Sequence, residues 1–265
     1  MKMQKKYYVM SAKAGLRKRV GFLDEIRGLC ILLMVLYHGA YDIIYLFGWD
    51  IPLFHWPLVQ LAQPFVAGIF IFISGICCRF SRSNLRRGLI ALALGLLVGG
   101  VTLLFLPQQP IYFGILHFLG TAMILFALLQ KMLDRLAPLP GLLLCLLLYL
   151  FSFGAQNGYL GLPGLPLLQL PTSWASHLWL IPLGFASGGV DYFPLLPWLF
   201  VFLAGSYLGV PFARGEMPGF FYRNRSRFLA ATGRHTIYIY LLHQPVLYGL
   251  LYGFFYLYGK AVGGA

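Results

Sequence analysis

Long apolar runs recur along almost the whole sequence, and they constrain the fold more than any other feature. Only 10% of the residues are charged and 60% are hydrophobic, whereas a soluble domain carries about 25% charged residues. The runs are continuously apolar and do not alternate with polar residues, which favours membrane-spanning helices over the strands of a β-barrel. The sequence therefore predicts an all-α, polytopic helical membrane protein.

Seven of the runs are candidate spans, because a helix needs about 20 residues to cross a hydrocarbon core. A further run, 174–187, is shorter and is interrupted by His177, Pro182 and Gly184, so we expect it to be interfacial or re-entrant. The prediction is about 7–8 transmembrane helices in one domain, 27–258, between a basic segment, 1–26, and a short tail, 259–265. The seven runs are 27–47, 58–78, 88–106, 111–131, 140–155, 193–212 and 233–257.

Basic residues fall on one side of the predicted membrane. With seven spans and a cytoplasmic N-terminus, every Lys and Arg except Lys260 lies in a cytoplasmic segment or at its edge, in agreement with the positive-inside rule. This rule accounts for the formal net charge of +13 without a nucleic-acid partner. The opposite side holds a Gly-, Pro- and Leu-rich loop, 154–171. We expect an integral protein of a bacterial plasma membrane.

Two ionisable residues interrupt the first run, "GLCILLMVLYHGAYD". His38 and Asp42 are one helical turn apart on the same face, near the middle of the predicted membrane. Such groups are costly at this depth unless they are paired, and they often mark functional sites. Asp42 is predicted to accept a hydrogen bond from His38 and to orient it as a general base. A purely structural pair that tightens the helix bundle is the alternative.

Further polar residues lie in or beside the other runs. His243, in "GRHTIYIYLLHQPVL", has a depth that matches that of His38. His117 and Gln63 lie in the outer halves of their runs and are candidates to line one polar cavity with His38. Asp191, in "DYFPLLPW", is either a ligand or the cap of a helix that begins near Pro194.

The segment "RVGFLDEIRGLCILLMVLYHGAYD" resembles the opening of the transmembrane acyltransferase superfamily. More specifically, the chain resembles the bacterial membrane family related to heparan-α-glucosaminide N-acetyltransferase. Similar pieces are "PFVAGIFIFISGICCRFSR", "FGILHFLGTA", "SGGVDYFPLLPWLFVFLAGSYLG" and "GRHTIYIYLLHQPV". Together they extend from residue 19 to about residue 247.

The resemblance implies transfer of an acetyl or other acyl group from cytoplasmic acyl-CoA to a sugar or amino sugar at the outer face. A histidine in the middle of the membrane would act as base or acyl carrier, and His55 is the nearest counterpart of a functional loop histidine in the lysosomal members. Basic inner loops suit the phosphates of coenzyme A. Outer loops rich in Gly, Pro and aromatic residues, such as 154–171, suit a sugar.

Two other functions are compatible with the sequence. A proton-coupled transporter would use the same His and Asp residues as a relay, and a lipid-binding or assembly protein would need none of them. The four cysteines lie in or at the edges of apolar runs, so we expect buried thiols and no metal site. The expected partners are the bilayer and the acceptor, and the sequence leaves a homodimer open. The candidate residues are His38, Asp42, His243, His117 and His55 for catalysis, Arg27, Arg82, Arg86, Arg87 and Arg234 for acetyl-CoA, and Gln63, Asp191 and Trp198 for the acceptor.

Overall fold

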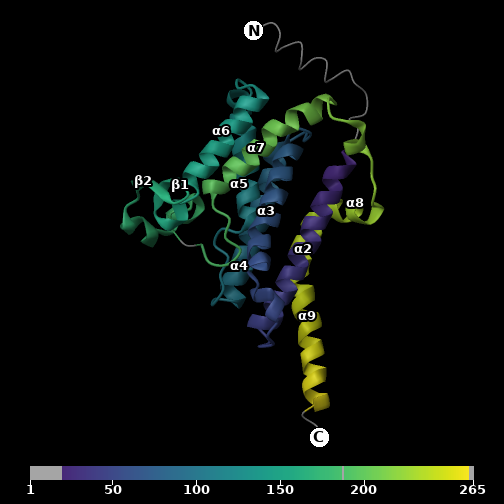
Figure 1. The fold of residues 1–265 in the computed structure, drawn as a ribbon. Helices are drawn as coiled ribbons and strands as arrows, with labels where there is room; N and C mark the ends of the chain where they lie inside the picture. Colours follow the sequence, from purple (N-terminus) through teal and green to yellow (C-terminus); the bar gives the residue numbers. More distant parts are fainter. Residues whose placement is uncertain (1–19, 187, 263–265) are drawn as a thin grey trace. The chain divides into compact units, whose positions relative to one another are not determined.

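The computed structural model describes residues 20–186 and 188–262, and most of them are helical (Figure 1). Within these residues, six segments are long and apolar enough to cross a membrane. The predicted all-α, polytopic membrane fold is therefore confirmed. The six are α2 (Gly21–Tyr45), α3 (Pro57–Cys78), α4 (Asn84–Phe105), α5 (Ile115–Leu133), the segment Pro138–Asn157 built on α6 (Pro138–Ser152), and α7 (Leu195–Arg214). Most of the predicted cytoplasmic segment, 1–26, lies outside the described residues.

The last predicted run, 233–257, differs from the structure. Two helices, α8 (Arg227–Arg234) and α9 (Thr236–Val262), meet at His235. α9 is 27 residues long, but its Tyr, His, Gln and Pro residues make it less apolar than the six segments above. It also continues beyond residue 258, where the sequence predicts a tail. Helix formation therefore extends further here than hydropathy alone indicates.

Contacts divide the described chain into two compact units, with the boundary inside α3 after Phe70. Unit 1 comprises the described residues up to Phe70 and from Met217 onward, and unit 2 comprises those from Ile71 to Glu216. Unit 1 also contains the short 3₁₀ helices η1 (Pro52–His55) and η5 (Gly219–Tyr222). Each unit is described by itself below.

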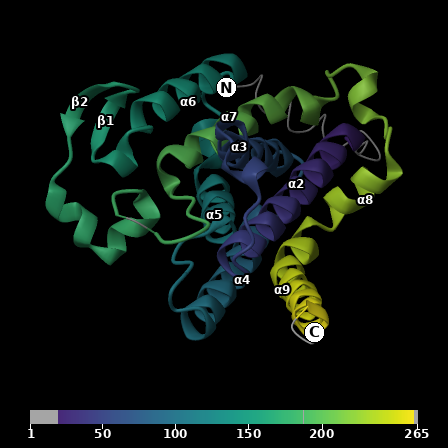
Figure 2. The same cartoon turned by 60° about the horizontal axis from the view of Figure 1, so that its bottom comes forward.

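Unit 1 is built along α2, with α8 beside its first half and α9 beside its second half (Figures 1 and 2). α2 and α8 approach so closely that a Cβ atom on Gly28 would overlap the Leu229 carbonyl. The buried Glu25 carboxylate accepts hydrogen bonds from the backbone N–H groups of Arg225 and Ser226. These N–H groups lie at the start of α8, where a helix leaves donors without internal partners. Glu25 therefore fixes the start of α8 against α2.

Unit 2 contains two close helix pairs, α4 with α5 and α6 with α7. In the first pair, a Cβ atom on Gly88 would lie 2.8 Å from the Gly120 carbonyl oxygen, so only glycine allows this backbone approach. In the second pair, Cys145 of α6 packs with Ala204 and Tyr207 of α7 in a buried apolar cluster. Small residues in the helix interfaces are expected where spanning helices pack closely in a membrane.

The predicted loop 154–171 contains regular structure instead. A 3₁₀ turn, η2 (Ala155–Asn157), leads into an antiparallel hairpin of β1 (Tyr159–Leu162) and β2 (Leu165–Gln169). Two further 3₁₀ helices, η3 (Thr172–Ser176) and η4 (Leu178–Leu183), follow the hairpin. Both are too short to cross a bilayer, so the prediction that 174–187 is not an ordinary span is confirmed for its described residues.

The connection from η4 to α7 is held by Tyr192. Its hydroxyl oxygen lies 2.6 Å from the Ile181 carbonyl oxygen and 2.7 Å from that of Ala186. Burial raises the pKa of the Tyr192 hydroxyl, so the group keeps its proton and remains a donor. This contact anchors the end of η4 to the start of α7.

Candidate functional site

Two of the predicted catalytic histidines lie next to each other in unit 1. The rings of His38, on α2, and His243, on α9, have centroids 5.1 Å apart and planes inclined by 63°. α2 and α9 are adjacent at this level, although the two residues are far apart in the sequence. The fold therefore brings together two candidates that the sequence could match only by their depth.

The orientation of His243 is set by its own helix. Its Nδ1 atom lies 2.6 Å from the carbonyl oxygen of Tyr240. A carbonyl oxygen only accepts hydrogen bonds, so Nδ1 carries the hydrogen, and Nε2 is the basic nitrogen of the neutral ring. The tautomer is assigned from this contact. A backbone acceptor thus holds His243 in the form that a general base requires.

Asp42 has a different partner from the predicted one. Its two carboxylate oxygens lie 2.9 and 3.0 Å from Nε2 of Gln244, and the residue is only 1% exposed. The sequence predicts a hydrogen bond from His38, but the donor is the side-chain amide nitrogen of Gln244 on the facing helix, which lies within reach of both carboxylate oxygens. Asp42 therefore links α2 to the residue that follows His243. We call His38, Asp42, His243 and Gln244 the histidine site.

Arg27, predicted to bind acetyl-CoA, makes contacts within unit 1. Its Nη2 atom donates to the Thr236 hydroxyl at 2.9 Å, and its guanidinium carbon lies 5.8 Å from the ring centroid of Phe70. These contacts connect α2 to the first residue of α9. Arg234, another predicted ligand, is exposed at the end of α8. The structure thus gives Arg27 a role in helix packing.

His117 and Asp191 both bind the start of α5 in unit 2. Nδ1 of His117 accepts from the N–H of Gly114 at 3.2 Å, and Oδ2 of Asp191 accepts from the N–H of Ile115 at 3.4 Å. The sequence leaves Asp191 as either a ligand or the cap of a helix beginning near Pro194; the structure places its carboxylate at the start of α5 instead, and the N-cap of α7 has no side-chain hydrogen bond. Helix starts carry donors without internal partners, and these two side chains satisfy two of them. The shared cavity of His117 with His38 draws on both units and stays a prediction.

The other outer candidates lie in separate surroundings. Nε2 of His55 is 2.8 Å from Oδ1 of Asp50, and both side chains are exposed. Gln63 lies half-buried on α3 in unit 1. Trp198, in unit 2, packs against Phe193 with ring centroids 5.5 Å apart. A role of any of these residues in binding an acceptor stays a prediction.

Three predicted coenzyme ligands gather at the beginning of α4. Arg82, Arg86 and Arg87 are all exposed there. Ser83 caps the helix by accepting from the N–H of Arg86 at 3.2 Å. A helix N-terminus carries partial positive charge and favours anions. Binding of coenzyme A phosphates by these arginines stays a prediction.

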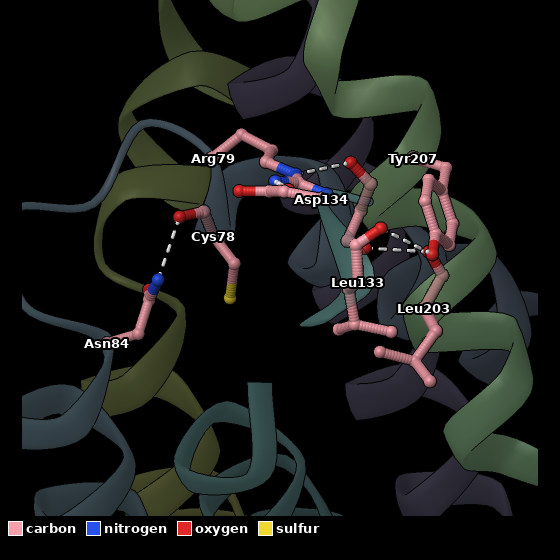
Figure 3. A network of polar contacts seen from close by, with 8 residues as sticks. Cys78, Arg79, Asn84, Leu133, Asp134, Leu203 and Tyr207 are labelled. Carbon is pink, nitrogen blue, oxygen red and sulfur yellow. Dashed lines mark hydrogen bonds and ion pairs between the residues drawn. The ribbon is translucent and has the colours of Figure 1, made fainter. Parts of the chain in front are cut away.

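Figure 3 shows a polar network in unit 2 that the sequence reasoning missed. Arg79 pairs with Asp134 through Nη1 and donates from Nε to the Ser206 carbonyl oxygen at 2.8 Å. The Tyr207 hydroxyl donates to the Leu133 carbonyl oxygen at 3.0 Å. These contacts join the ends of α3 and α5 to α7. We call Arg79, Asp134 and Tyr207 the arginine network.

One sequence signal was available for this network. Arg79 directly follows the run 58–78, and Asp134 follows the run 111–131 by three residues, and both runs end on the same predicted side of the membrane. In the sequence, Arg79 contributes to the charge asymmetry, and neither Asp134 nor Gln244 is among the predicted site residues.

A family model described as "Heparan-alpha-glucosaminide N-acetyltransferase, catalytic" matches residues 19–245. The match begins just before α2 and ends within α9, so it includes the whole histidine site. No curated protein matches the chain, and no solved structure does.

Proposed function

Because the chain belongs to the family of the heparan-alpha-glucosaminide N-acetyltransferase catalytic domain, we propose that it transfers an acetyl group from acetyl-CoA, across the membrane, to a sugar or amino sugar. Acetyl-CoA would bind from the cytoplasm, where the N-terminus lies, and the acceptor would bind at the outer face of a bacterial plasma membrane. The observation that carries the proposal is the pair of His38, on the spanning helix α2, and His243, on the adjacent helix α9, whose ring centroids lie 5.1 Å apart.

The transfer needs a base, and His243 has the required form. Nε2 takes the proton from an acceptor hydroxyl or neutral amine while the acceptor oxygen or nitrogen attacks the thioester carbonyl carbon. The C–S bond then breaks, and coenzyme A leaves as a thiolate that recovers the proton from the imidazolium. His38 lies close enough to support the developing charge or to exchange the proton. General-base catalysis of this kind contributes roughly 10²–10⁴ in rate.

Asp42 and Gln244 act as positioning residues in this proposal. The amide of Gln244 is held by both oxygens of Asp42. Gln244 follows His243 in the chain, so this contact restrains the backbone that carries the base. A displacement of about 1 Å at a reacting group can cost about 10²-fold in rate. The pair would therefore matter for rate even though neither group needs to touch a substrate.

The proposed coenzyme site uses the exposed arginines at the start of α4. Arg82, Arg86 and Arg87 offer charged donors for phosphate oxygens. The expected partners are thus the bilayer, acetyl-CoA and a sugar acceptor, and no nucleic acid.

Proteoliposomes test the proposal. Purified protein is reconstituted with glucosamine enclosed, and radiolabelled acetyl-CoA is added outside. The expected result is labelled N-acetylglucosamine in the lumen together with free coenzyme A outside. Uptake of glucosamine or protons without any acetylated product would contradict the proposal and favour a carrier. Liposomes without protein, and liposomes in which the acceptor is added outside only, serve as controls.

A further inference from the structure

The segment from η2 to η4, residues 155–183, presents apolar side chains at its surface. We call it the interface segment. The sequence contains no Asp, Glu, Lys or Arg between Arg135 and Asp191. Leu167 is 63% exposed, Leu178 74% and Trp179 72%. Contiguous exposed apolar surface marks a contact region, so water is not the expected neighbour of this segment.

The length of the spanning segment built on α6 places the beginning of the interface segment near one face of the hydrocarbon core. α6 has 15 residues, and the turn and η2 that follow bring the spanning segment to 20 residues, Pro138–Asn157. At 1.5 Å per helical residue this length covers about 30 Å, the thickness of a hydrocarbon core. α6 begins close after Arg135, so the chain reaches the opposite boundary of the core near η2.

The backbone of the interface segment fits the boundary between hydrocarbon and water. Several of its backbone groups are hydrogen-bonded within the chain. The Asn157 N–H donates to the Gly154 carbonyl oxygen at 2.8 Å, and the Leu170 N–H donates to the Gly158 carbonyl oxygen at 2.8 Å. Among the described residues, the sheet has only the strands β1 and β2, so each strand has an edge outside the ladder. Lipid-exposed sheet edges do not occur in the hydrocarbon core. They are tolerated where headgroups and water supply partners.

The exposed leucines continue from the spanning helix into the interface segment. On α6, Leu147 is 62% exposed, and on β2, Leu168 is 56% exposed. Large apolar side chains are thus exposed both on α6 and on the hairpin that follows it. Tyr159, Trp174 and Trp179 add the aromatic types that are enriched at membrane interfaces.

From these observations we propose that the interface segment lies in the headgroup region of the leaflet at the end of α6, with Leu167 and Leu178 directed into the acyl chains. Its partner is bilayer lipid, and it is not an aqueous sugar-binding loop. This proposal does not depend on acetyl transfer. It replaces the expectation that the loop 154–171 holds a sugar.

Site-directed fluorescence measures the depth directly. The four native cysteines are replaced, and an environment-sensitive fluorophore is attached to Leu167→Cys or Leu178→Cys in nanodiscs. Arg223→Cys, which is exposed in unit 1, provides the matched control. Gel filtration checks that each labelled variant is folded. Quenching is compared between lipids with a nitroxide near the headgroup, lipids with a nitroxide deep in the chain, and an aqueous quencher.

Blue-shifted emission and strongest quenching by the shallow nitroxide, at both positions 167 and 178, are the expected results. The control should respond mainly to the aqueous quencher. Aqueous quenching at 167 and 178 equal to that of the control would overturn the proposal. Protection from both lipid and water, together with cross-linking between two copies, would also overturn it, because a second chain would then cover the segment.

Discussion

The histidine site of unit 1 and the arginine network of unit 2 both place polar groups among apolar helices, but their partners differ. Arg79 faces the opposite charge of Asp134 and lies 5.1 Å from the ring centroid of Phe126. In the histidine site, Asp42 is held by the neutral amide of Gln244, and His243 by a backbone carbonyl. The arginine network pairs opposite charges, whereas the histidine site orients its groups through neutral partners.

The difference separates a structural polar cluster from a reactive one. A largely buried ion pair keeps both of its partners charged, because neutralising either one leaves the charge of the other uncompensated. A histidine whose Nδ1–H is held by a carbonyl has a fixed tautomer, in which Nε2 is the basic nitrogen. Buried polar groups in membrane helices are therefore informative only when their partners are known. The following substitutions test whether the two clusters divide in this way.

Replacing His243 by Gln is expected to have the largest effect. Loss of the base should lower the rate of acetyl transfer roughly 10²–10⁴-fold, with unchanged folding. His235→Gln is the matched control, because His235 makes a similar contact, Nδ1 to the Ala231 carbonyl oxygen at 2.9 Å, but is exposed. Steady-state release of free coenzyme A checks both variants. Equal rates for the two variants would remove His243 from the chemistry.

Replacing Arg79 by Met should affect stability. The change leaves Asp134 without its ion-pair partner, and breaking a buried pair typically costs about 3–5 kcal/mol in the free energy of unfolding. Because Asp134 is partly exposed, the lower end of this range is expected. Thermal or detergent titration measures the loss. Arg86→Met, at an exposed position, should change stability by less than about 0.5 kcal/mol. Similar values for both variants would argue against the network.

A Gln244→Leu substitution tests the link between Asp42 and the base. It leaves a buried carboxylate without its donor, which should cost about 1–3 kcal/mol in the free energy of unfolding. The rate should also fall, because the backbone at His243 loses its restraint. Gln60→Leu is the control, since Gln60 donates only to the Phe54 carbonyl oxygen and is exposed. A stability loss without any loss of rate would assign Gln244 to structure alone.

The smallest effect is expected for Tyr207→Phe. This variant removes the hydrogen bond to the Leu133 carbonyl oxygen and keeps the ring in place, so stability should fall by about 0.5–1.5 kcal/mol. The rate of the folded protein should not change. A large loss of rate at unchanged stability would place the arginine network in the chemistry and remove the distinction between the two clusters.

Much of the fold could be predicted from hydropathy, since each spanning helix is a long apolar run. His38 and His243 could be chosen as candidates from the sequence, because ionisable residues at mid-membrane depth are costly, and the structure places their rings side by side. The partner of Asp42 could not, because it depends on the register between α2 and α9, which the sequence does not specify. His38, one turn away on the same helix, is the predicted donor, whereas the structure places the side-chain amide of Gln244, on the facing helix α9, beside the Asp42 carboxylate.

At two other places, the local sequence pattern does not indicate the contact or the secondary structure that the structure shows. Asp191 precedes Pro194 and looks like the cap of the next helix, yet tertiary contacts bring it to the start of α5. The hairpin after α6 lacks the alternation that usually predicts strands, because its residues are apolar on both faces. In both cases the local sequence pattern does not specify the pairing that the structure shows.

The central claim is that His38 and His243 act together as the proton-transfer centre. A double-mutant cycle tests it most directly, using coenzyme A release by folded His38→Gln, His243→Gln and the double variant in nanodiscs with acetyl-CoA and glucosamine. Residues that act as a unit show non-additive losses, so the double variant should be about as slow as the slower single variant. Losses that multiply, or a single variant with the wild-type rate, would contradict the claim.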